Sequence, residues 1–189
     1  MEEKMERVAR KIEFLENPKK RGNIPPKELL GMIPIKNTDT ILDLGAGTGY
    51  ITVPAARTTA GMVYALDIDA DMLDLIKSKA EKEKIENIIT LKDSIDHIPL
   101  PDNSIGLALA SLVLHEMPSL PRALGQIKRV LKPGGYFVCI EFEKKDFPKE
   151  RHPRIASSEM EEAIKLAGLN VSRKLFFTDA IYMIKAKKL

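Results

Sequence analysis

The stretch ILDLGAGTGY, residues 41–50, limits what this chain can fold into more than any other segment. Four apolar or acidic residues lead into glycines on alternate positions, which is typical of a buried strand ending in a tight turn. The turn is close to the dinucleotide fingerprint G-x-G-x-x-G, whose last glycine would fall at position 50, where this chain has Tyr50. The misfit disfavours NAD, so the rest of the sequence must indicate the ligand.

Strand and helix patterns alternate along the remainder of the chain. The predicted helices span residues 5–16, 26–31, 50–58, 70–84, 120–131 and 157–168. The predicted strands span residues 40–44, 62–67, 87–92, 105–111, 134–143, 169–177 and 180–188. We expect Asp69 to cap the fourth helix, Ser157 to cap the last helix and Gly168 to end it.

This alternation predicts an α/β fold, in which a parallel sheet carries helices on both faces. With 189 residues the chain is long enough for one domain with a substantial core. We expect a single domain over residues 1–189, with a helical cap at 1–33 and the α/β core at 38–189. In such sheets ligands bind at the carboxyl ends of the strands.

Each of the first three predicted strands brings a carboxylate to this edge: Asp43, Asp67 and Asp93. Asp67 lies 67 − 49 = 18 residues after Gly49, close to the roughly 20 expected of an acid that binds ribose hydroxyls. Three acids would repel a pyrophosphate but would suit a ligand with cationic centres. S-adenosylmethionine has a ribose, a sulfonium and an ammonium, and no phosphate.

A family resemblance rests on four motifs that occur in order along the chain. They are ILDLGAGTGY, VYALDIDADML, LKDSIDHIPLPDNSIGLALASLVLHEM and RVLKPGG. Over roughly residues 17–189 the chain resembles the class I S-adenosylmethionine-dependent methyltransferases. It looks most like their small ubiquinone/menaquinone-type, or methyltransferase type 11-like, group. The resemblance implies a doubly wound, Rossmann-like sheet of seven strands, mostly parallel with the last strand antiparallel. It also implies S-adenosyl-L-methionine as the cofactor.

The resemblance further assigns residues to the amino-acid end of the cofactor. Gly45, Gly47 and Gly49 would let the backbone approach the methionine part. Asp43 would orient the ammonium, often through water, and the carbonyl of Ser111 would accept from the same ammonium.

Four more residues are assigned by the resemblance to the nucleoside end. Asp67 would bind the ribose hydroxyls, and Ile68 would lie against the adenine ring. Asp93 would accept a hydrogen bond from the adenine amino group, and the backbone N–H of Ser94 would donate to the ring.

His115 is the candidate catalytic residue, because it follows the fourth strand where the acceptor would approach the methyl group. Glu116 stands where the family often has a second histidine, and this pair could either deprotonate an acceptor or cap the fold. We interpret His97 as a solvated loop residue and His152 as part of a charged surface loop, with a substrate lid as the alternative. Cys139 is expected to be a buried small hydrophobe, and no residue is assigned to a metal.

We favour transfer of a methyl group to a small-molecule acceptor. The alternatives are an RNA or protein methyltransferase and a catalytically silent, cofactor-binding partner protein. No NPPY-like tetrad follows the fourth strand, which argues against methylation of exocyclic amines on adenine or glutamine. The single cysteine argues against thiol-dependent arsenite methylation. The net charge of +3 and the interleaved acidic residues at 143–154 give no strong nucleic-acid signal.

The remaining expectations concern location and assembly. No apolar run reaches the ~20 residues of a membrane span, and the N-terminus lacks a signal-peptide core. With one cysteine, the chain is expected in the cytoplasm, as a monomer or homodimer. We expect the helix at 5–16 and the loop at 143–154 to close over the acceptor side. The alternative is that the apolar stripe of the helix packs on the helical layer of the sheet.

Overall fold

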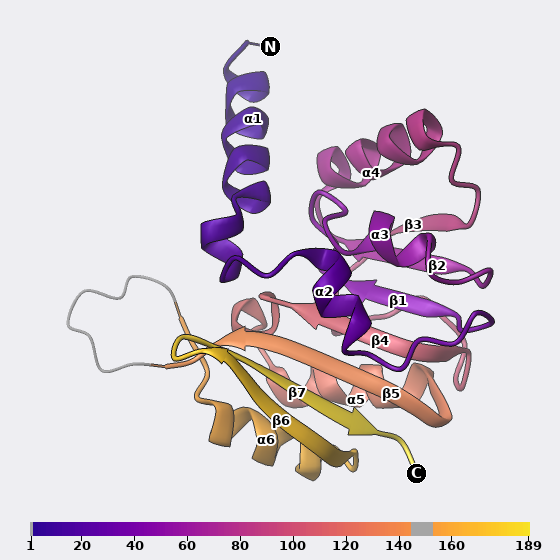
Figure 1. Ribbon diagram of the computed structural model, residues 1–189, viewed down its shortest axis with the longest axis vertical. Coiled ribbons are helices and arrows are strands. Elements are labelled where there is room, and N and C mark those ends of the chain that lie inside the picture. The colour runs from indigo at the N-terminus through magenta and orange to yellow at the C-terminus, as the bar shows by residue number, and fades with distance from the viewer. Residues whose placement is uncertain (1, 145–152) are drawn as a thin grey trace.

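The computed structural model describes residues 2–144 and 153–189, with a seven-stranded sheet of order β3-β2-β1-β4-β5-β7-β6 at its centre (Figure 1). The strands are β1 (Ile41–Leu44), β2 (Val63–Asp67), β3 (Ile88–Lys92), β4 (Ile105–Ser111), β5 (Leu131–Phe142), β6 (Asn170–Thr178) and β7 (Ile181–Lys187). Strands β1 to β5 pair in parallel, whereas β7 runs antiparallel to both β5 and β6. The predicted fold class is confirmed.

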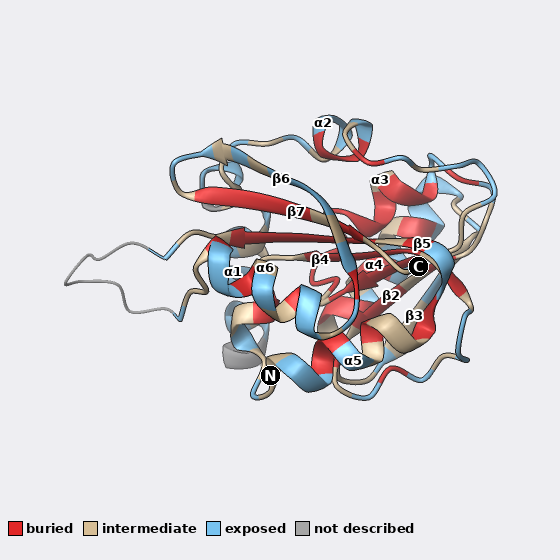
Figure 2. Ribbon diagram, turned by 90° about the horizontal axis from the view of Figure 1, so that it is seen from below, coloured by how far each residue is buried: buried red, intermediate tan, exposed pale blue. Residues whose placement is uncertain are grey.

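Helices cover both faces of the sheet. They are α1 (Glu2–Glu16), α2 (Pro26–Gly31), α3 (Thr52–Ala56), α4 (Ala70–Glu83), α5 (Leu120–Val130) and α6 (Ser157–Leu166), with 3-10 turns η1 (Pro18–Arg21) and η2 (Leu114–Glu116). Leu109 of β4 packs in one cluster with Leu30 of α2, and its neighbour Ala108 packs on the opposite face with Leu124 of α5. Because side chains alternate along a strand, the strands are buried from both sides (Figure 2).

The register of the sheet aligns the carboxyl ends of its central strands. Leu44, the last residue of β1, pairs with Leu66 of β2 and with Ala110 of β4. Asp67 and Ser111 each follow those partners by one residue, so both lie at the same edge as the glycine turn after β1. Sequences that are far apart in the chain therefore meet at one place.

Two details of the predicted elements are wrong, and one end signal is confirmed. Ser157 does not cap α6: the cap is Ala156, and Ser157 is the first helical residue. The Ser157 N–H donates instead to a carboxylate oxygen of Glu143, 3.0 Å away, so another segment satisfies this helix terminus. Strand β5 begins earlier than expected, at Leu131. Gly168 follows the last cap residue with a φ of 80°, as expected of a helix stop.

Helix α1 stands beside the rest of the domain (Figure 1). Its apolar stripe is incompletely covered: Met5 and Phe14 are exposed, and Ile12 and Leu15 are half-buried. None of the buried clusters of the described residues includes a residue of α1. The apolar stripe of α1 is therefore only partly covered by the rest of the described chain. In the described part of the chain, no helix combines the length and the apolar character needed to cross a membrane.

Candidate functional site

The turn between β1 and α3 holds Gly45, Gly47 and Gly49. A Cβ atom at Gly45 would meet Val113 at 2.4 Å, and one at Gly49 would meet Ile76 at 2.9 Å. Packing inside the protein thus requires these two glycines whatever else binds there. At Gly47 the nearest side-chain atom would be 3.4 Å away, yet its φ of +52° disfavours any side chain. The backbone is most open to a ligand at Gly47.

Asp43 lies inside the sheet edge, with only 2% of its surface exposed. The hydroxyl of Thr52, the first residue of α3, donates to its carboxylate across 2.6 Å. Burial raises the pKa of Asp43 to about 6, although the Thr52 hydrogen bond and the charge of Arg21 both act to lower it. A cationic group placed here would stabilise the ionised carboxylate.

Asp67 ends β2 and turns its carboxylate toward the glycine turn. One oxygen accepts the N–H of Gly47 at 2.8 Å, and the other accepts the N–H of Asp69 at 2.9 Å. A carboxylate oxygen can accept two hydrogen bonds, so capacity remains on both oxygens for vicinal hydroxyls. Next to it, Ile68 is 72% exposed, an uncovered apolar side chain beside the site. Asp69 caps α4 through the N–H of Asp71, as predicted.

Asp93 follows β3 and is already engaged with its neighbours. Its carboxylate accepts the N–H of Ser94 at 2.8 Å and lies 3.0 Å from Nδ1 of His97. The Ser94 hydrogen bond, and then the His97 ring, hold the pKa of Asp93 below its usual value. His97 is exposed as predicted, but it is an Asp93 partner rather than only a solvated side chain. The backbone N–H of Ser94, which was expected to donate to the adenine ring, donates to Asp93 instead.

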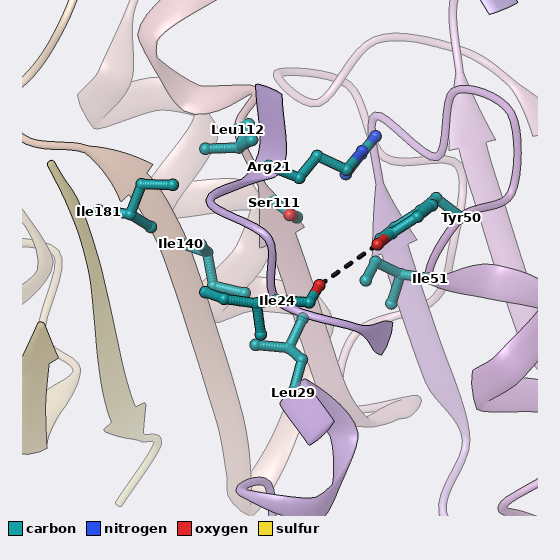
Figure 3. A pocket seen from close by; sticks show the side chains of 9 residues that line it. All are labelled: Arg21, Ile24, Leu29, Tyr50, Ile51, Ser111, Leu112, Ile140 and Ile181. Carbon is teal, nitrogen blue, oxygen red and sulfur yellow. Dashed lines mark hydrogen bonds between the residues drawn. The ribbon is translucent and has the colours of Figure 1, made fainter. Parts of the chain in front are cut away.

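Ser111 lines a cavity at the carboxyl ends of the central strands (Figure 3). Its lining residues are Arg21, Ile24, Leu29, Tyr50, Ile51, Ser111, Leu112, Ile140 and Ile181. The Tyr50 hydroxyl donates to the carbonyl of Ile24 at 3.3 Å, which ties the segment before α2 to the glycine turn. The residue that breaks the dinucleotide fingerprint therefore builds one wall of this cavity.

His115, in η2, is paired with a residue that the sequence did not single out. Its Nδ1 lies 2.7 Å from the carboxylate of Glu141 on β5, whereas its Nε2 lies 3.9 Å from Glu116. The Glu141 carboxylate is fully buried and also accepts the N–H groups of Val113 and Leu114 at 3.0 and 2.7 Å. Glu116 is beyond hydrogen-bonding distance but within ion-pair range of a charged ring, so the stronger partner of His115 is Glu141.

The Glu141 hydrogen bond raises the pKa of His115, because it stabilises the charged ring, although burial opposes the shift. With Nδ1–H donating to Glu141, the neutral ring presents Nε2 as its acceptor. A histidine fixed in this way can take up a proton in a defined direction.

Helix α1 reaches the glycine turn and the start of α4. Lys11 pairs with Asp69 at 2.6 Å, and Glu16 pairs with Lys79, whose ammonium also donates to the carbonyl of Thr48 at 2.9 Å. These contacts place α1 at the turn after β1 and at α4. Most of the loop predicted as a second lid, including His152, lies outside the described residues.

Comparison with known proteins shows which family the chain belongs to. Residues 42–139 match the family described as a methyltransferase domain. The chain belongs to this family. It is a class I methyltransferase domain, as the motifs indicated, and the cofactor of the family is S-adenosylmethionine.

Sequence relatives of this methyltransferase domain are longer than the chain. The demethylmenaquinone methyltransferase of Symbiobacterium thermophilum is 34% identical over 122 residues, which cover 62% of this chain and 48% of that protein. A ubiquinone/menaquinone biosynthesis C-methyltransferase of Bartonella henselae is 32% identical over 111 residues, covering 57% of this chain and 43% of that protein. The chain spans about half the length of the curated relatives it matches.

A solved structure matches nearly the whole methyltransferase chain. The S-adenosylmethionine-dependent methyltransferase from Aquifex aeolicus superposes with a TM-score of 0.85 and 27% identity, covering 95% of this chain and 97% of that one. The Haloferax volcanii methyltransferase solved with its Trm112 activator has a TM-score of 0.80 at 20% identity, over 95% of this chain and 93% of the matched chain. This second likeness concerns the fold alone.

The carboxylates and the apolar side chain at this edge of the sheet suit S-adenosylmethionine. The buried Asp43 carboxylate matches a cationic centre, and Asp67 retains capacity for hydroxyl donors. The exposed Ile68 side chain offers an apolar surface to a planar ring. The individual roles of these residues stay predictions, as do those of Asp93, Ser94, Ser111 and the three glycines.

Sequence analysis missed two charged residues of this region, Glu141 and Arg21. Glu141 stands in an apolar strand pattern, and Arg21 in a basic run before the first turn. The charge inside the apolar run CIEF was a usable signal, because a buried acid needs partners. No comparable signal distinguishes Arg21 from the lysines beside it.

Proposed function

We propose that this chain transfers the methyl group of S-adenosylmethionine to a small, largely apolar acceptor. The observation that carries the proposal is the cavity of Figure 3, because it lies beside the glycine turn and at the end of β4. Six of its nine lining residues are apolar: Ile24, Leu29, Ile51, Leu112, Ile140 and Ile181. Such a lining favours an apolar molecule, and because the cavity measures only about 20 Å³, a ring-sized acceptor has to widen it on binding.

When bound, the cofactor supplies a methyl group already activated by its sulfonium. The chain therefore has to position the acceptor in line and about 3 Å from the methyl carbon. The lining of the cavity supports this role, since Leu112 and Ile140 come from neighbouring strand ends and Ile24 from the segment before α2. A rigid sheet edge fixes two of these walls.

His115 is not among the residues that line the cavity; it is proposed to take, from the end of β4, the proton of an acceptor that loses one. Support comes from the Nδ1 contact with Glu141 at 2.7 Å, which leaves Nε2 as the acceptor atom. Glu141 is a positioning residue in this proposal: it fixes the ring and raises the pKa of His115. Among the described residues, Nε2 has no hydrogen-bond partner, since Glu116 is 3.9 Å away.

The names of the relatives suggest the first acceptor class to test. They are a demethylmenaquinone methyltransferase and a C-methyltransferase of ubiquinone and menaquinone biosynthesis. A reduced quinone ring is flat, apolar and carries hydroxyl protons. We therefore propose ring carbon methylation of a quinol-type acceptor.

A transfer assay with methyl-labelled S-adenosylmethionine tests the proposal. The acceptors are a short-tailed demethylated quinol, total RNA and a protein extract, each incubated with wild-type chain and with His115→Gln. Label in the quinol, reduced at least tenfold in His115→Gln, is the expected result. Label in RNA or protein would contradict a small-molecule acceptor. Cofactor binding without label in any class would favour a silent partner protein.

The role of Glu141 has its own readout. A base works only when unprotonated, so activity falls at pH values below the pKa of His115. Glu141→Gln removes the charge that raises this pKa, and the acid limb of the activity profile should move to lower pH. A reduced rate with an unmoved acid limb would show that Glu141 supports only the fold.

A further inference from the structure

The amino-acid end of S-adenosylmethionine carries two opposite charges on one carbon, an ammonium and a carboxylate. The family resemblance assigns the ammonium to Asp43 and Ser111 and leaves the carboxylate without a partner. An anion brought into a partly buried site needs a cation or several N–H donors. The question is which positive group of the described residues lies close enough to Asp43.

Two cations lie near the glycine turn, Lys79 and Arg21. The ammonium of Lys79 is already bound by Glu16 and by the carbonyl of Thr48. Arg21 uses only Nε, which donates to the carbonyl of Leu15 at 2.6 Å. Its two terminal Nη groups make no hydrogen bond to any residue that the structure describes. These groups form the flat double donor that matches a carboxylate.

The fold holds Arg21 in place. It is the last residue of η1, and Gly22 follows it with a φ of 69°. A Cβ atom at Gly22 would meet the Ile181 side chain of β7 at 2.4 Å, so the turn lies directly on the sheet. The guanidinium carbon lies 4.4 Å from the centroid of the Tyr50 ring. Arg21 is therefore oriented from two sides before any ligand binds.

Charge favours the same assignment. Burial lowers the pKa of Arg21, and Asp43 is the strongest of the charges that oppose this shift. Burial likewise disfavours the ionised form of Asp43 and raises its pKa, whereas the positive charge of Arg21 stabilises that form. Asp43 and Arg21 are thus two opposite charges that burial removes from water. A zwitterion bound between them would add an opposite charge next to each one.

The cavity connects Arg21 with Ser111 at the end of β4, and Leu29 lies at its opposite end (Figure 3). Asp43 is not among its lining residues and is linked to Arg21 by charge. We propose that the guanidinium of Arg21 binds the carboxylate at the amino-acid end of the cofactor. This rests on the cofactor site of the proposed function. The apolar end, toward Leu29, is left for the acceptor.

Titration calorimetry with two ligands tests the inference. The probes are S-adenosylhomocysteine and its decarboxylated analogue, S-adenosyl-3-thiopropylamine, which keeps the ammonium and lacks the carboxylate. The wild-type chain should prefer S-adenosylhomocysteine by about tenfold to a hundredfold, the worth of charged hydrogen bonds. In Arg21→Met this preference should disappear, while the analogue binds as before.

The matched control is Lys19→Met, which removes an exposed cation of the same 3-10 turn and should keep the wild-type preference. Melting temperatures show whether each variant folds. If Arg21→Met does not fold, Arg21→Lys decides: it keeps the charge, loses the flat fork and should show an intermediate preference. An Arg21→Lys preference equal to that of the wild type would overturn the inference.

The outcomes also separate this inference from the proposed function. Equal weakening of both ligands in Arg21→Met, or an unchanged preference for S-adenosylhomocysteine, would overturn the role of Arg21 alone. A wild-type chain that binds neither ligand would overturn the cofactor site itself. Unchanged cofactor affinity with a raised KM for the acceptor would assign Arg21 to the acceptor instead, and would also contradict the inference.

Discussion

The two ends of the candidate cofactor site are built differently. At the end near β1, Asp43 is 2% exposed and has a side-chain partner, Thr52, at 2.6 Å. At the end near β2, Asp67 is half-buried and, among the residues that the structure describes, accepts only backbone N–H groups, from Gly47 and Asp69. One end is a buried charge that lacks solvation, and the other is an open carboxylate with spare acceptor capacity.

This difference shows how one sheet edge serves a ligand with two chemical ends. A buried acid binds a cation strongly, because few waters compete for it. A half-exposed acid recognises hydroxyl donors by direction rather than by charge. Mutation and pH should therefore affect the two ends in different ways.

The largest effect is expected at the turn that joins both ends. Gly47→Val should abolish binding of S-adenosylhomocysteine, because the φ of +52° penalises a branched side chain and the Gly47 N–H bonds to Asp67. Calorimetry measures binding, and circular dichroism checks the fold. Gly125→Val on α5 is the control, since a Cβ there would meet nothing within 4 Å. Normal binding by a folded Gly47→Val chain would remove the turn from the site.

A smaller loss is expected at the ribose end. Asp67→Ala should weaken S-adenosylhomocysteine binding by roughly 1.5–3 kcal/mol, because hydrogen bonds to a charged acceptor are lost. Asp74→Ala, at an exposed acid paired with Lys77 on α4, should leave the affinity unchanged. Equal affinities of Asp67→Ala and the wild type in calorimetry would rule out the ribose assignment.

The pH dependence of binding should come from the buried end. Because burial raises the pKa of Asp43 to about 6, this carboxylate takes up a proton below that pH and no longer attracts an ammonium. Affinity should then fall about tenfold for each pH unit below it. Calorimetry from pH 4.5 to 8 should show this slope for the wild type and a flat profile for Asp43→Asn. If affinity falls with pH equally in the wild type and in Asp43→Asn, a group other than Asp43 takes up the proton.

Protonation of Asp43 should weaken cofactor binding but stabilise the folded chain. The folded-state pKa of Asp43 lies above its usual value of 3.8, so the folded chain holds the proton more tightly. The contribution of Asp43 to the free energy of unfolding is therefore highest below pH 3.8 and falls as the pH rises to about 6, by at most ~3 kcal/mol, and it is measured as the difference between the wild type and Asp43→Asn. Urea unfolding should show this fall in the wild type. Its persistence in Asp43→Asn would contradict the assignment.

The smallest effect is expected at α1, which is proposed to act as a lid. Bound S-adenosylhomocysteine should slow hydrogen exchange in residues 5–16, because an ordered lid opens less often. Deleting residues 1–16 should reduce turnover more than stability. Unchanged exchange, together with a deletion that unfolds the chain, would show that α1 only packs against Asp69 and Lys79.

Local pattern predicted most of the fold and the outline of the site. The alternation of strands and helices, the glycine turn and the acids at three strand ends depend on neighbours in sequence, and the structure confirms them. The pairing of His115 with Glu141 joins residues 26 apart, on β5 and the turn after β4. It follows from the register of β4 with β5, which no local pattern specifies.

Some errors have the same cause. Ser157 has the residue type of a helix cap, yet the Glu143 carboxylate from another segment occupies its N–H. Arg21 looks like one member of a basic run until the fold places it over Tyr50. Local propensity predicts what a residue can do, and tertiary contacts decide which partner it has.

The central claim is that one sheet edge binds the cofactor, with its amino-acid end at Asp43 and its ribose at Asp67. A crystal structure of the chain with S-adenosylhomocysteine tests it most directly. The account predicts ribose hydroxyls at about 2.7 Å from the Asp67 carboxylate, with the amino-acid end between Asp43, Ser111 and Arg21. A nucleoside bound elsewhere, with Asp67 still contacting only Gly47 and Asp69, would contradict it.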